Sequence, residues 1–150
     1  MKSSTDVIII EDNELLRDSF KEAINKSSSI RCENTFSSGE AALDIIEKKE
    51  LVPDIILLDI GLPGMNGIEM IPELRKLTPS SKIIIITVHD DDENVFNAIC
   101  AGASGYLLKD LSSDRIIASI NEVVNDGAPM NSNIAKKVLN MFRDQNVKSN

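Results

Sequence analysis

The chain has 150 residues, 42% hydrophobic and 27% charged, which is the length and composition of one globular domain with a sizeable core. Its net charge of -8 excludes tight binding of nucleic acid or of an acidic membrane by this chain alone. The sequence has neither a membrane-spanning run nor a signal-peptide pattern, and the isolated Cys32 and Cys100 lack metal-ligand spacing, so we expect a cytoplasmic protein with reduced thiols.

Apolar runs and helical patterns alternate along the chain. The apolar runs predict five strands, at Val7–Ile10, Ile30–Phe36, Ile55–Leu58, Lys82–Thr87 and Gly105–Leu108. Helical spacing of apolar residues predicts five helices. They lie at about Glu14–Lys26, in a segment that begins near Ser37 and is closed by Pro53, at about Gly67–Leu77, at Asp91–Ala101, and from Ser112 or Ser113 to Gly127. This alternation predicts an α/β fold: a doubly wound, five-stranded parallel sheet with helices on both faces and the flavodoxin-like order 2-1-3-4-5.

Local signals predict several helix ends. Ser37 and Glu40 have the spacing of a capping box at the start of the second helix. Pro72 falls inside the third helix, where an interior proline costs up to about 3 kcal/mol, so we expect a kink or a late start there. Gly127 is the expected stop signal of the fifth helix.

Residues 128–150 follow the predicted domain of residues 1–127 and have a different pattern. A short linker leads into a helix with one apolar side, formed by Ile134, Val138, Met141 and Phe142. Such a stripe must be buried. Either the helix folds back on its own domain, or it faces a further domain or a partner. We expect it near the fifth helix or against a partner subunit.

Polar side chains lie at the carboxyl ends of four predicted strands: Glu11 with Asp12, Asp59, Thr87 and Lys109. In a doubly wound sheet the first and third strands are neighbours at the switch point, so the three carboxylates are expected in one crevice. Clustered carboxylates repel, so a cation must neutralise them or one must protonate. All-oxygen ligation favours Mg²⁺ or Mn²⁺ over zinc. With a hydroxyl and an ammonium group beside it, this site fits phosphoryl transfer onto Asp59.

Each of these residues also has an ordinary structural interpretation. A strand-terminal aspartate is often a turn or cap residue, and Glu11-Asp12 could complement the dipole of the helix that follows. Thr87 could be a β-branched strand residue, and Lys109 a solvated surface lysine. The functional interpretation rests on all five residues falling at strand ends that the predicted topology brings to one edge.

The motifs at these positions resemble those of bacterial response-regulator receiver domains, from about Asp6 to Gly127. The resemblance lies in Glu11-Asp12, in LLDIGLPGMNG around Asp59, in Thr87, and in GASGYLLKD around Lys109. The forms DIGLPGMNGIE and AGASGYLLKD further resemble the NarL/FixJ subfamily, whose members usually carry a C-terminal LuxR-type helix-turn-helix. These 150 residues hold no such domain. We therefore expect either a receiver whose output domain lies outside this chain, or a stand-alone receiver in a phosphorelay or in protein–protein contact.

The resemblance assigns a phosphoacceptor and a metal site. Asp59 is expected to take a phosphoryl group from a sensor histidine kinase. Asp12, Asp59 and the backbone carbonyl of Gly61 are expected to coordinate Mg²⁺, with Glu11 acting directly or through water. Many receivers have two aspartates where this chain has Glu11-Asp12.

The resemblance also assigns a switch. Lys109 is expected to pair with the phosphoryl oxygens, and Thr87 to rotate inward and hydrogen-bond one of them. Tyr106 occupies the position of the switch aromatic and is expected to move inward as well, although it could be a plain half-buried sheet residue. His89, two residues past Thr87, is expected either at the rim of the site or as an ordinary loop residue. Asp110 follows Lys109 where many receivers have proline.

The expected output is homodimerisation, or control of a DNA-binding domain that regulates transcription, with no membrane partner and no enzymatic activity beyond the chain's own phosphoryl transfer and dephosphorylation. Two other classes fit less well. A phosphatase of the haloacid-dehalogenase type needs an acid two residues past the nucleophile, where this chain has Gly61. A flavodoxin-like cofactor binder needs a phosphate loop after the first strand, where Glu11-Asp12 would repel phosphate.

Overall fold

The computed structural model describes residues 4–48 and 50–148. The outermost parts of the predicted segments 1–127 and 128–150, which are residues 1–3 and 149–150, lie outside the described residues, as does residue 49. Five strands form one sheet: β1 (Thr5–Ile10), β2 (Ile30–Phe36), β3 (Ile55–Leu58), β4 (Lys82–Thr87) and β5 (Gly105–Leu108). All pairings are parallel and the order is β2-β1-β3-β4-β5, which confirms the predicted topology.

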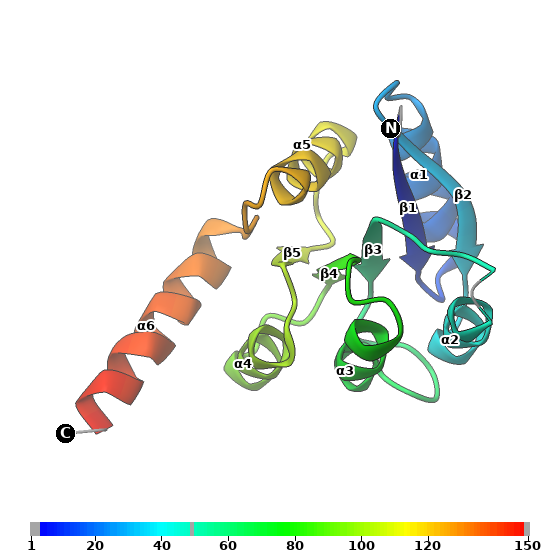
Figure 1. The fold of residues 1–150 in the computed structure, drawn as a ribbon. Coiled ribbons are helices and arrows are strands. Elements are labelled where there is room, and N and C mark those ends of the chain that lie inside the picture. The colour runs from blue at the N-terminus through cyan, green and yellow to red at the C-terminus, as the bar shows by residue number, and fades with distance from the viewer. Residues whose placement is uncertain (1–3, 49, 149–150) are drawn as a thin grey trace.

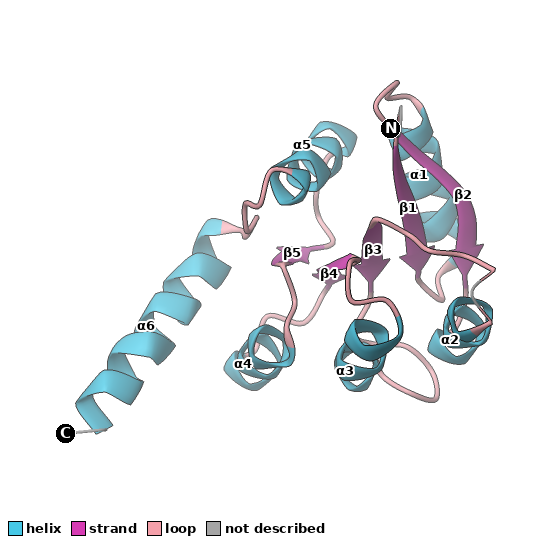
Figure 2. Ribbon diagram, viewed as in Figure 1, coloured by secondary structure: helices cyan, strands magenta, loops and turns pink. Residues whose placement is uncertain are grey.

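Helices cover both faces of this sheet. They are α1 (Glu14–Asn25), α2 (Gly39–Glu47), α3 (Gly67–Leu77), α4 (Asp92–Ala101), α5 (Ser113–Val124) and α6 (Ser132–Lys148). Figure 1 shows α1 and α5 on one face, and α2, α3 and α4 on the other. In Figure 2 the short strands form a single layer between these two sets of helices. No helix within the described ranges is both long enough and apolar enough to cross a membrane.

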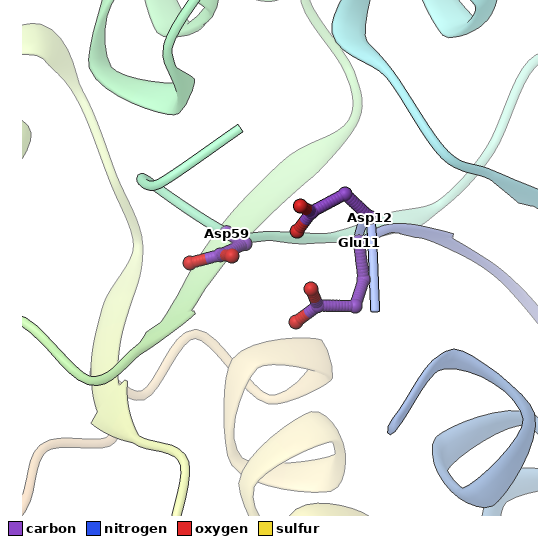
Figure 3. A group of neighbouring side chains, drawn as sticks. All are labelled: Glu11, Asp12 and Asp59. Carbon is purple, nitrogen blue, oxygen red and sulfur yellow. The ribbon is translucent and has the colours of Figure 1, made fainter. Parts of the chain in front are cut away.

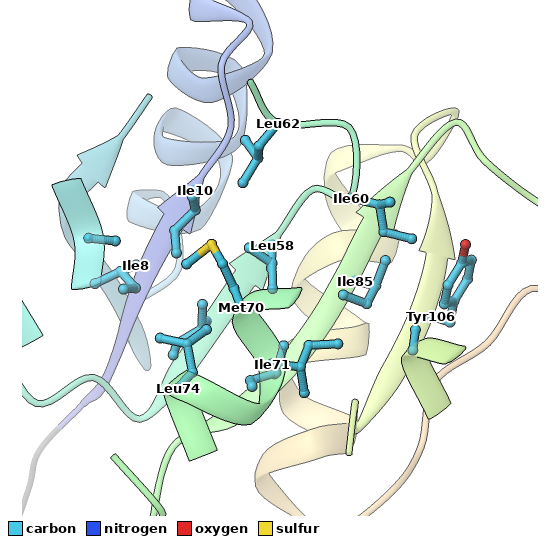
Figure 4. Packing of buried hydrophobic residues seen from close by; sticks show 14 of the residues in the cluster. Ile8, Ile10, Leu58, Ile60, Leu62, Met70, Ile71, Leu74, Ile85 and Tyr106 are labelled. Atoms are coloured by element: carbon cyan, nitrogen blue, oxygen red, sulfur yellow. The ribbon is translucent and has the colours of Figure 1, made fainter. Parts of the chain in front are cut away.

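The core consists of two layers because successive strand residues point to opposite faces of the sheet. Val7 and Ile9 pack with α1 and α5, whereas Ile8 and Ile10 pack with α2 and α3. Figure 4 shows the second of these clusters, with Tyr106 at its β5 end. The strands are rich in β-branched residues and buried on both faces, as parallel sheets require. Each such side chain contributes about 1.5–3 kcal/mol on burial, so the sheet is a rigid base for its loops.

The predicted start of α2 was wrong, whereas α3 begins at Gly67 as predicted. The N-cap of α2 is Ser38, whose hydroxyl accepts a hydrogen bond from the Ala41 N–H at 3.2 Å, so the capping box of Ser37 with Glu40 does not form. The late start of α3 does not occur, because the Asn66 side chain caps the helix from its first turn. The helix continues through Pro72.

The end of α5 also differs from expectation. The residue with left-handed backbone is Asp126, with φ 66°, and not Gly127. The Gly127 N–H donates to the Glu122 carbonyl at 2.7 Å, which satisfies one of the last helical carbonyls. Lys82, at the start of β4, donates to the Val123 carbonyl at 3.1 Å and pairs with the Asp126 carboxylate. This tertiary contact offsets the strain of a non-glycine residue there.

The last helix, α6, folds back on its own domain. It packs against α4, so the expectation of a position near α5 was wrong. Ile134 is fully buried, and Lys137 Nζ lies 2.9 Å from the Asp92 carboxylate at the start of α4. The chain turns toward α4 because Met130 pairs with Tyr106 along the free edge of β5. The last turns of α6 extend past α4 (Figure 1).

A stability prediction follows from Ser119 on α5. This side chain is fully buried, and its hydroxyl has no hydrogen-bond partner among the described residues. A buried hydroxyl without a partner costs free energy, so Ser119→Ala should raise the free energy of unfolding by about 1 kcal/mol. Urea denaturation measures the change. In the same helix, Ser112→Ala removes the N-cap and should lower the free energy by about 1 kcal/mol. A loss of stability in Ser119→Ala would contradict the prediction.

Candidate functional site

The register of the sheet brings the carboxyl ends of β1, β3, β4 and β5 to the same edge. Ile10 at the end of β1 lies opposite Leu58 at the end of β3, and the Asp59 N–H donates to the Ile10 carbonyl at 3.1 Å. On the other side, the Lys109 N–H donates to the Thr87 carbonyl at 2.9 Å. The residues that follow these strands therefore emerge at one edge of the sheet, as parallel topology requires.

Three carboxylates meet at this edge, as the sequence predicted. One carboxylate oxygen from each of Glu11, Asp12 and Asp59 lies within 4.8 Å of the other two. Figure 3 shows Glu11 and Asp12 extending from the end of β1 toward Asp59. Glu11 is 2% exposed and Asp59 5% exposed, whereas Asp12 is open to solvent. Two of the three negative charges are thus held away from water, where repulsion is strong.

Lys109 neutralises part of this charge. Its Nζ lies 2.6 Å from Glu11 Oε1 and 3.0 Å from Asp59 Oδ2. The second oxygen of each buried carboxylate accepts a backbone N–H, from Asn13 at 3.0 Å and from Gly61 at 3.2 Å respectively. Both buried carboxylates are therefore hydrogen-bonded at both oxygens, which makes their burial tolerable.

Among these groups the negative charges of the three carboxylates outnumber the positive charge of Lys109. Burial raises the pKa of Glu11, the nearby Asp59 charge raises it further, and the hydrogen bonds from Lys109 and Asn13 only partly oppose this. Burial lowers the pKa of Lys109, but its hydrogen bonds to Glu11 and Asp59 outweigh that effect and leave the pKa above its usual value. The lysine is therefore a fixed cation facing more than one carboxylate. A further cation fits here.

The donor set suits a hard divalent cation. The converging groups are carboxylate oxygens, which match Mg²⁺ or Mn²⁺ and offer nothing to a metal that prefers nitrogen or sulfur. Asp12 and Asp59 approach from two different strand ends. The Gly61 amide contacts Asp59, and the role expected for the Gly61 carbonyl stays a prediction.

Thr87 and Tyr106 are linked through the backbone of His89. The Thr87 hydroxyl accepts the His89 N–H at 3.3 Å, and the Tyr106 hydroxyl donates to the His89 carbonyl at 2.5 Å. Thr87 and Tyr106 are both fully buried. The expectation that Tyr106 moves inward on phosphorylation stays a prediction. In this structure its ring is fully buried in the same core cluster as Ile134, so the alternative of a half-buried sheet residue was wrong.

His89 lies at one of its two expected positions, whereas Arg17 makes a contact that the sequence did not predict. A Cβ placed on Gly61 would lie 3.2 Å from His89 Nε2 and 3.9 Å from Asp59 Oδ2, so the imidazole lies at the rim of the site. The Arg17 guanidinium donates to the Glu11 carbonyl at 2.9 Å. Arg17 lies one turn into α1, and nothing in its local pattern distinguishes it from an ordinary surface arginine. The Lys109–Asp110 peptide bond is trans.

The raised pKa of Glu11 predicts a pH dependence of stability. Its contribution is fully present below its usual pKa of 4.5 and is lost as the pH rises through the higher folded-state value. Glu11→Gln keeps the hydrogen-bonding shape without the charge. The stability of this variant relative to the wild-type chain should therefore rise between about pH 4 and pH 7. Urea denaturation at both pH values tests this, with the exposed Glu14→Gln as control. Equal differences at both pH values would contradict it.

Comparison with known proteins agrees with this geometry. Residues 7–121 match the family model described as the response regulator receiver domain. The transcriptional regulatory protein DegU of Brevibacillus brevis is 31% identical over 137 residues, which are 91% of this chain and 57% of DegU. The nitrate/nitrite response regulator NarL of Escherichia coli K12 is 34% identical over 116 residues, which are 77% of this chain and 53% of NarL. The chain thus spans a little over half the length of these two relatives.

Solved structures show the same fold. The signal receiver domain of a NarL regulator from Mycobacterium tuberculosis has a TM-score of 0.76 at 28% identity, over 83% of this chain and 98% of the other. A LuxR-family response regulator from Aurantimonas sp. SI85-9A1 has a TM-score of 0.82 at 23% identity, over 93% of this chain and 98% of the other, and supports the fold alone. The family match, the two regulators and the carboxylate–lysine site together show that this chain belongs to the response-regulator receiver domains.

Proposed function

We propose that Asp59 is the phosphoacceptor of this receiver and that its donor is the phosphohistidine of a sensor histidine kinase. The observation that carries the proposal is the position of the Asp59 carboxylate, which lies at the end of β3 with Oδ2 3.0 Å from Lys109 Nζ. The Gly61 N–H fixes the other oxygen. A carboxylate held by a cation on one side and open to Asp12 on the other is oriented for attack on phosphorus.

The transfer is a displacement at phosphorus. An Asp59 carboxylate oxygen forms the new O–P bond while the N–P bond to the donor histidine breaks, and the electron pair leaves with the imidazole. Lys109 stays protonated, since its hydrogen bonds raise its pKa, and it pairs with the charge gathering on the phosphoryl oxygens. Hydrolysis of the aspartyl phosphate by water restores the site. We assign the chain no reaction on another substrate.

A divalent cation belongs to this site. Asp12 and Asp59 would hold Mg²⁺, with Glu11 direct or through water and the Gly61 carbonyl as a further ligand. The bound ion supplies charge neutralisation for the incoming phosphoryl group. Glu11 is already engaged by Lys109 and by Asn13, so its oxygens are less available than the exposed carboxylate of Asp12.

The response to phosphorylation runs through Thr87. Its hydroxyl now accepts from the His89 N–H, and it would instead donate to a phosphoryl oxygen. That exchange moves the His89 backbone, to which Tyr106 is bonded. The expected output is homodimerisation or the release of a DNA-binding domain that controls transcription. The relatives that support this output are named as transcriptional or nitrate/nitrite response regulators.

The phosphoacceptor is tested by intact mass. With acetyl phosphate and Mg²⁺, the wild-type chain should gain one phosphoryl group that is stable to acid and labile to base. Asp59→Asn should gain none, because the attacking carboxylate is gone. Asp110→Asn, an exposed aspartate next to Lys109, should behave as wild type. Uptake by Asp59→Asn at the wild-type level would overturn the assignment.

The cation is tested by thermal unfolding. Mg²⁺ should stabilise the wild-type chain, by about 2.7 kcal/mol at a hundredfold excess over its dissociation constant. Asp12→Asn should unfold at a higher temperature without Mg²⁺, because repulsion is relieved, and should gain little when Mg²⁺ is added. Asp18→Asn, at an exposed position on α1, serves as the matched control. Full Mg²⁺ stabilisation of Asp12→Asn would exclude the proposed ligand.

A further inference from the structure

The free edge of β5 is covered by three residues of the segment that leads into α6. β5 is the last strand of the sheet, so alternate backbone N–H groups face away from β4. The Tyr106 N–H donates to the Pro129 carbonyl at 3.0 Å. The Leu108 N–H donates to the Asn131 side-chain oxygen at 2.8 Å. Residues 129–131, which we call the strap, thus bind both outward-facing donors of this short strand.

The strap lies tightly against the strand. A Cβ placed on Gly105 would lie 2.9 Å from Pro129 Cγ and 3.0 Å from the Pro129 carbonyl oxygen. Any side chain at this position would push the strap away. Met130 forms one isolated parallel bridge to Tyr106, so the strap runs alongside the edge strand without adding a strand to the sheet. The close approach and the paired donors are independent observations of one contact.

On its far side the strap is continuous with α6. Ile134, in the first turn of that helix, is fully buried in the same core cluster as Tyr106. Lys137, one turn later, pairs with Asp92 on α4 at 2.9 Å. The docking of α6 on α4 therefore sets where the strap lies.

On its near side the strap holds two parts of the phosphoryl site. The Asn131 side chain accepts a hydrogen bond from the Leu108 N–H. The next residue is Lys109, whose Nζ contacts Glu11 and Asp59. The Pro129 carbonyl accepts a hydrogen bond from the Tyr106 N–H, and the Tyr106 hydroxyl donates to the His89 carbonyl. Displacement of the strap would loosen both Lys109 and Tyr106, because β5 is four residues long and pairs with a strand on one side only.

We propose that the strap is a positioning element of the phosphoryl site, with Asn131 as its main positioning residue, and that it links the docking of α6 to the occupancy of Asp59. This inference rests on the proposed function, since it names how that same site is regulated. Linkage between two sites is reciprocal. If docked α6 holds Lys109 in place for the phosphoryl group, then a phosphoryl group at Asp59 strengthens the docking of α6.

The test compares four variants of this 150-residue chain with the wild-type chain. Asn131→Ala removes the acceptor for the Leu108 N–H, and Asn131→Asp keeps an oxygen in its place. Asn133→Ala, at an exposed position two residues on, is the matched control. Ile134→Val loosens the anchor of α6 mildly, so the proposal can still be tested if Asn131→Ala does not fold. Circular dichroism checks that each variant is folded.

Two readouts separate positioning from general stability. The first is the rate of phosphoryl uptake from acetyl phosphate with Mg²⁺, measured over a range of donor concentrations. The second is acrylamide quenching of tyrosine fluorescence without any donor. This signal reports on Tyr106 alone, because the chain has one tyrosine and no tryptophan. A purely structural role would alter unfolding but leave both readouts of the folded protein unchanged.

The expected result is a loss of maximal rate in Asn131→Ala by at least about tenfold, since a misplacement of roughly 1 Å can cost about a hundredfold. The half-saturating donor concentration should stay the same, and Tyr106 quenching should rise. Ile134→Val should shift both readouts in the same direction by less. Asn131→Asp should restore both, and Asn133→Ala should match wild type. With beryllofluoride bound at Asp59, amide exchange of α6 should slow in the wild-type chain.

Contrary results would overturn the inference in distinguishable ways. Unchanged uptake and quenching in both Asn131→Ala and Ile134→Val would show that the strap does not position the site. An equal loss in Asn133→Ala would show that the effect is not specific to the Leu108 contact. A wild-type chain that takes up no phosphoryl group would overturn the proposed function itself. Normal uptake in the wild type together with unchanged variants would overturn this inference alone.

Discussion

The structure depends on one electrostatic constraint, which is that the carboxylates of Glu11, Asp12 and Asp59 lie together beside Lys109. Glu11 and Asp59 are almost fully buried, and Lys109 contacts both. Buried charges are tolerated only where hydrogen bonds and counter-charges surround them. Here the backbone N–H groups of Asn13 and Gly61 complete the set. The strands before these residues consist of buried isoleucine and leucine, and such a rigid base can hold like charges together. The negative charge that remains favours the binding of a divalent cation at this edge of the sheet.

The fold could be predicted from the sequence because its signals are local and repeated. Each strand is a short apolar run, and each run is followed by a helical pattern, so the topology and the edge that carries the site follow from alternation alone. The errors occurred where a distant contact decided a local outcome. Asp126 takes the left-handed position at the end of α5, where Lys82 contacts it from β4. The position of α6 beside α4 depends on the pairing of Met130 with Tyr106, which no periodicity encodes.

The contacts at the site also fall into two groups, those that the sequence predicts and those that it does not. Its side-chain chemistry was predictable, because Asp59 and Lys109 have a recognisable residue type at a recognisable place. Its backbone chemistry was not. The N–H of Asn13 on Glu11, the N–H of Gly61 on Asp59 and both backbone groups of His89 act through atoms that every residue but proline carries. Residue type gives no signal for such contacts, and only the folded path of the chain creates them. The buried state of Tyr106 belongs here too, since it follows from the segment that covers it.

The position of β5 explains why conformational response should concentrate there. A central strand such as β3 is held on both sides, by β1 and by β4, so its carboxyl end can fix the charge of Asp59 without moving. β5 is four residues long and has a strand on one side only, so the other edge must be stabilised by something weaker than a full ladder. Residues 129–131 supply two hydrogen bonds there. Two hydrogen bonds can be broken or strengthened by a free-energy change of a few kcal/mol. Differences in ligand binding energy of this magnitude shift conformational populations. The sheet thus combines a rigid centre, which holds the Asp59 carboxylate in place, with an edge held by few hydrogen bonds, where the proposed response to phosphorylation would occur.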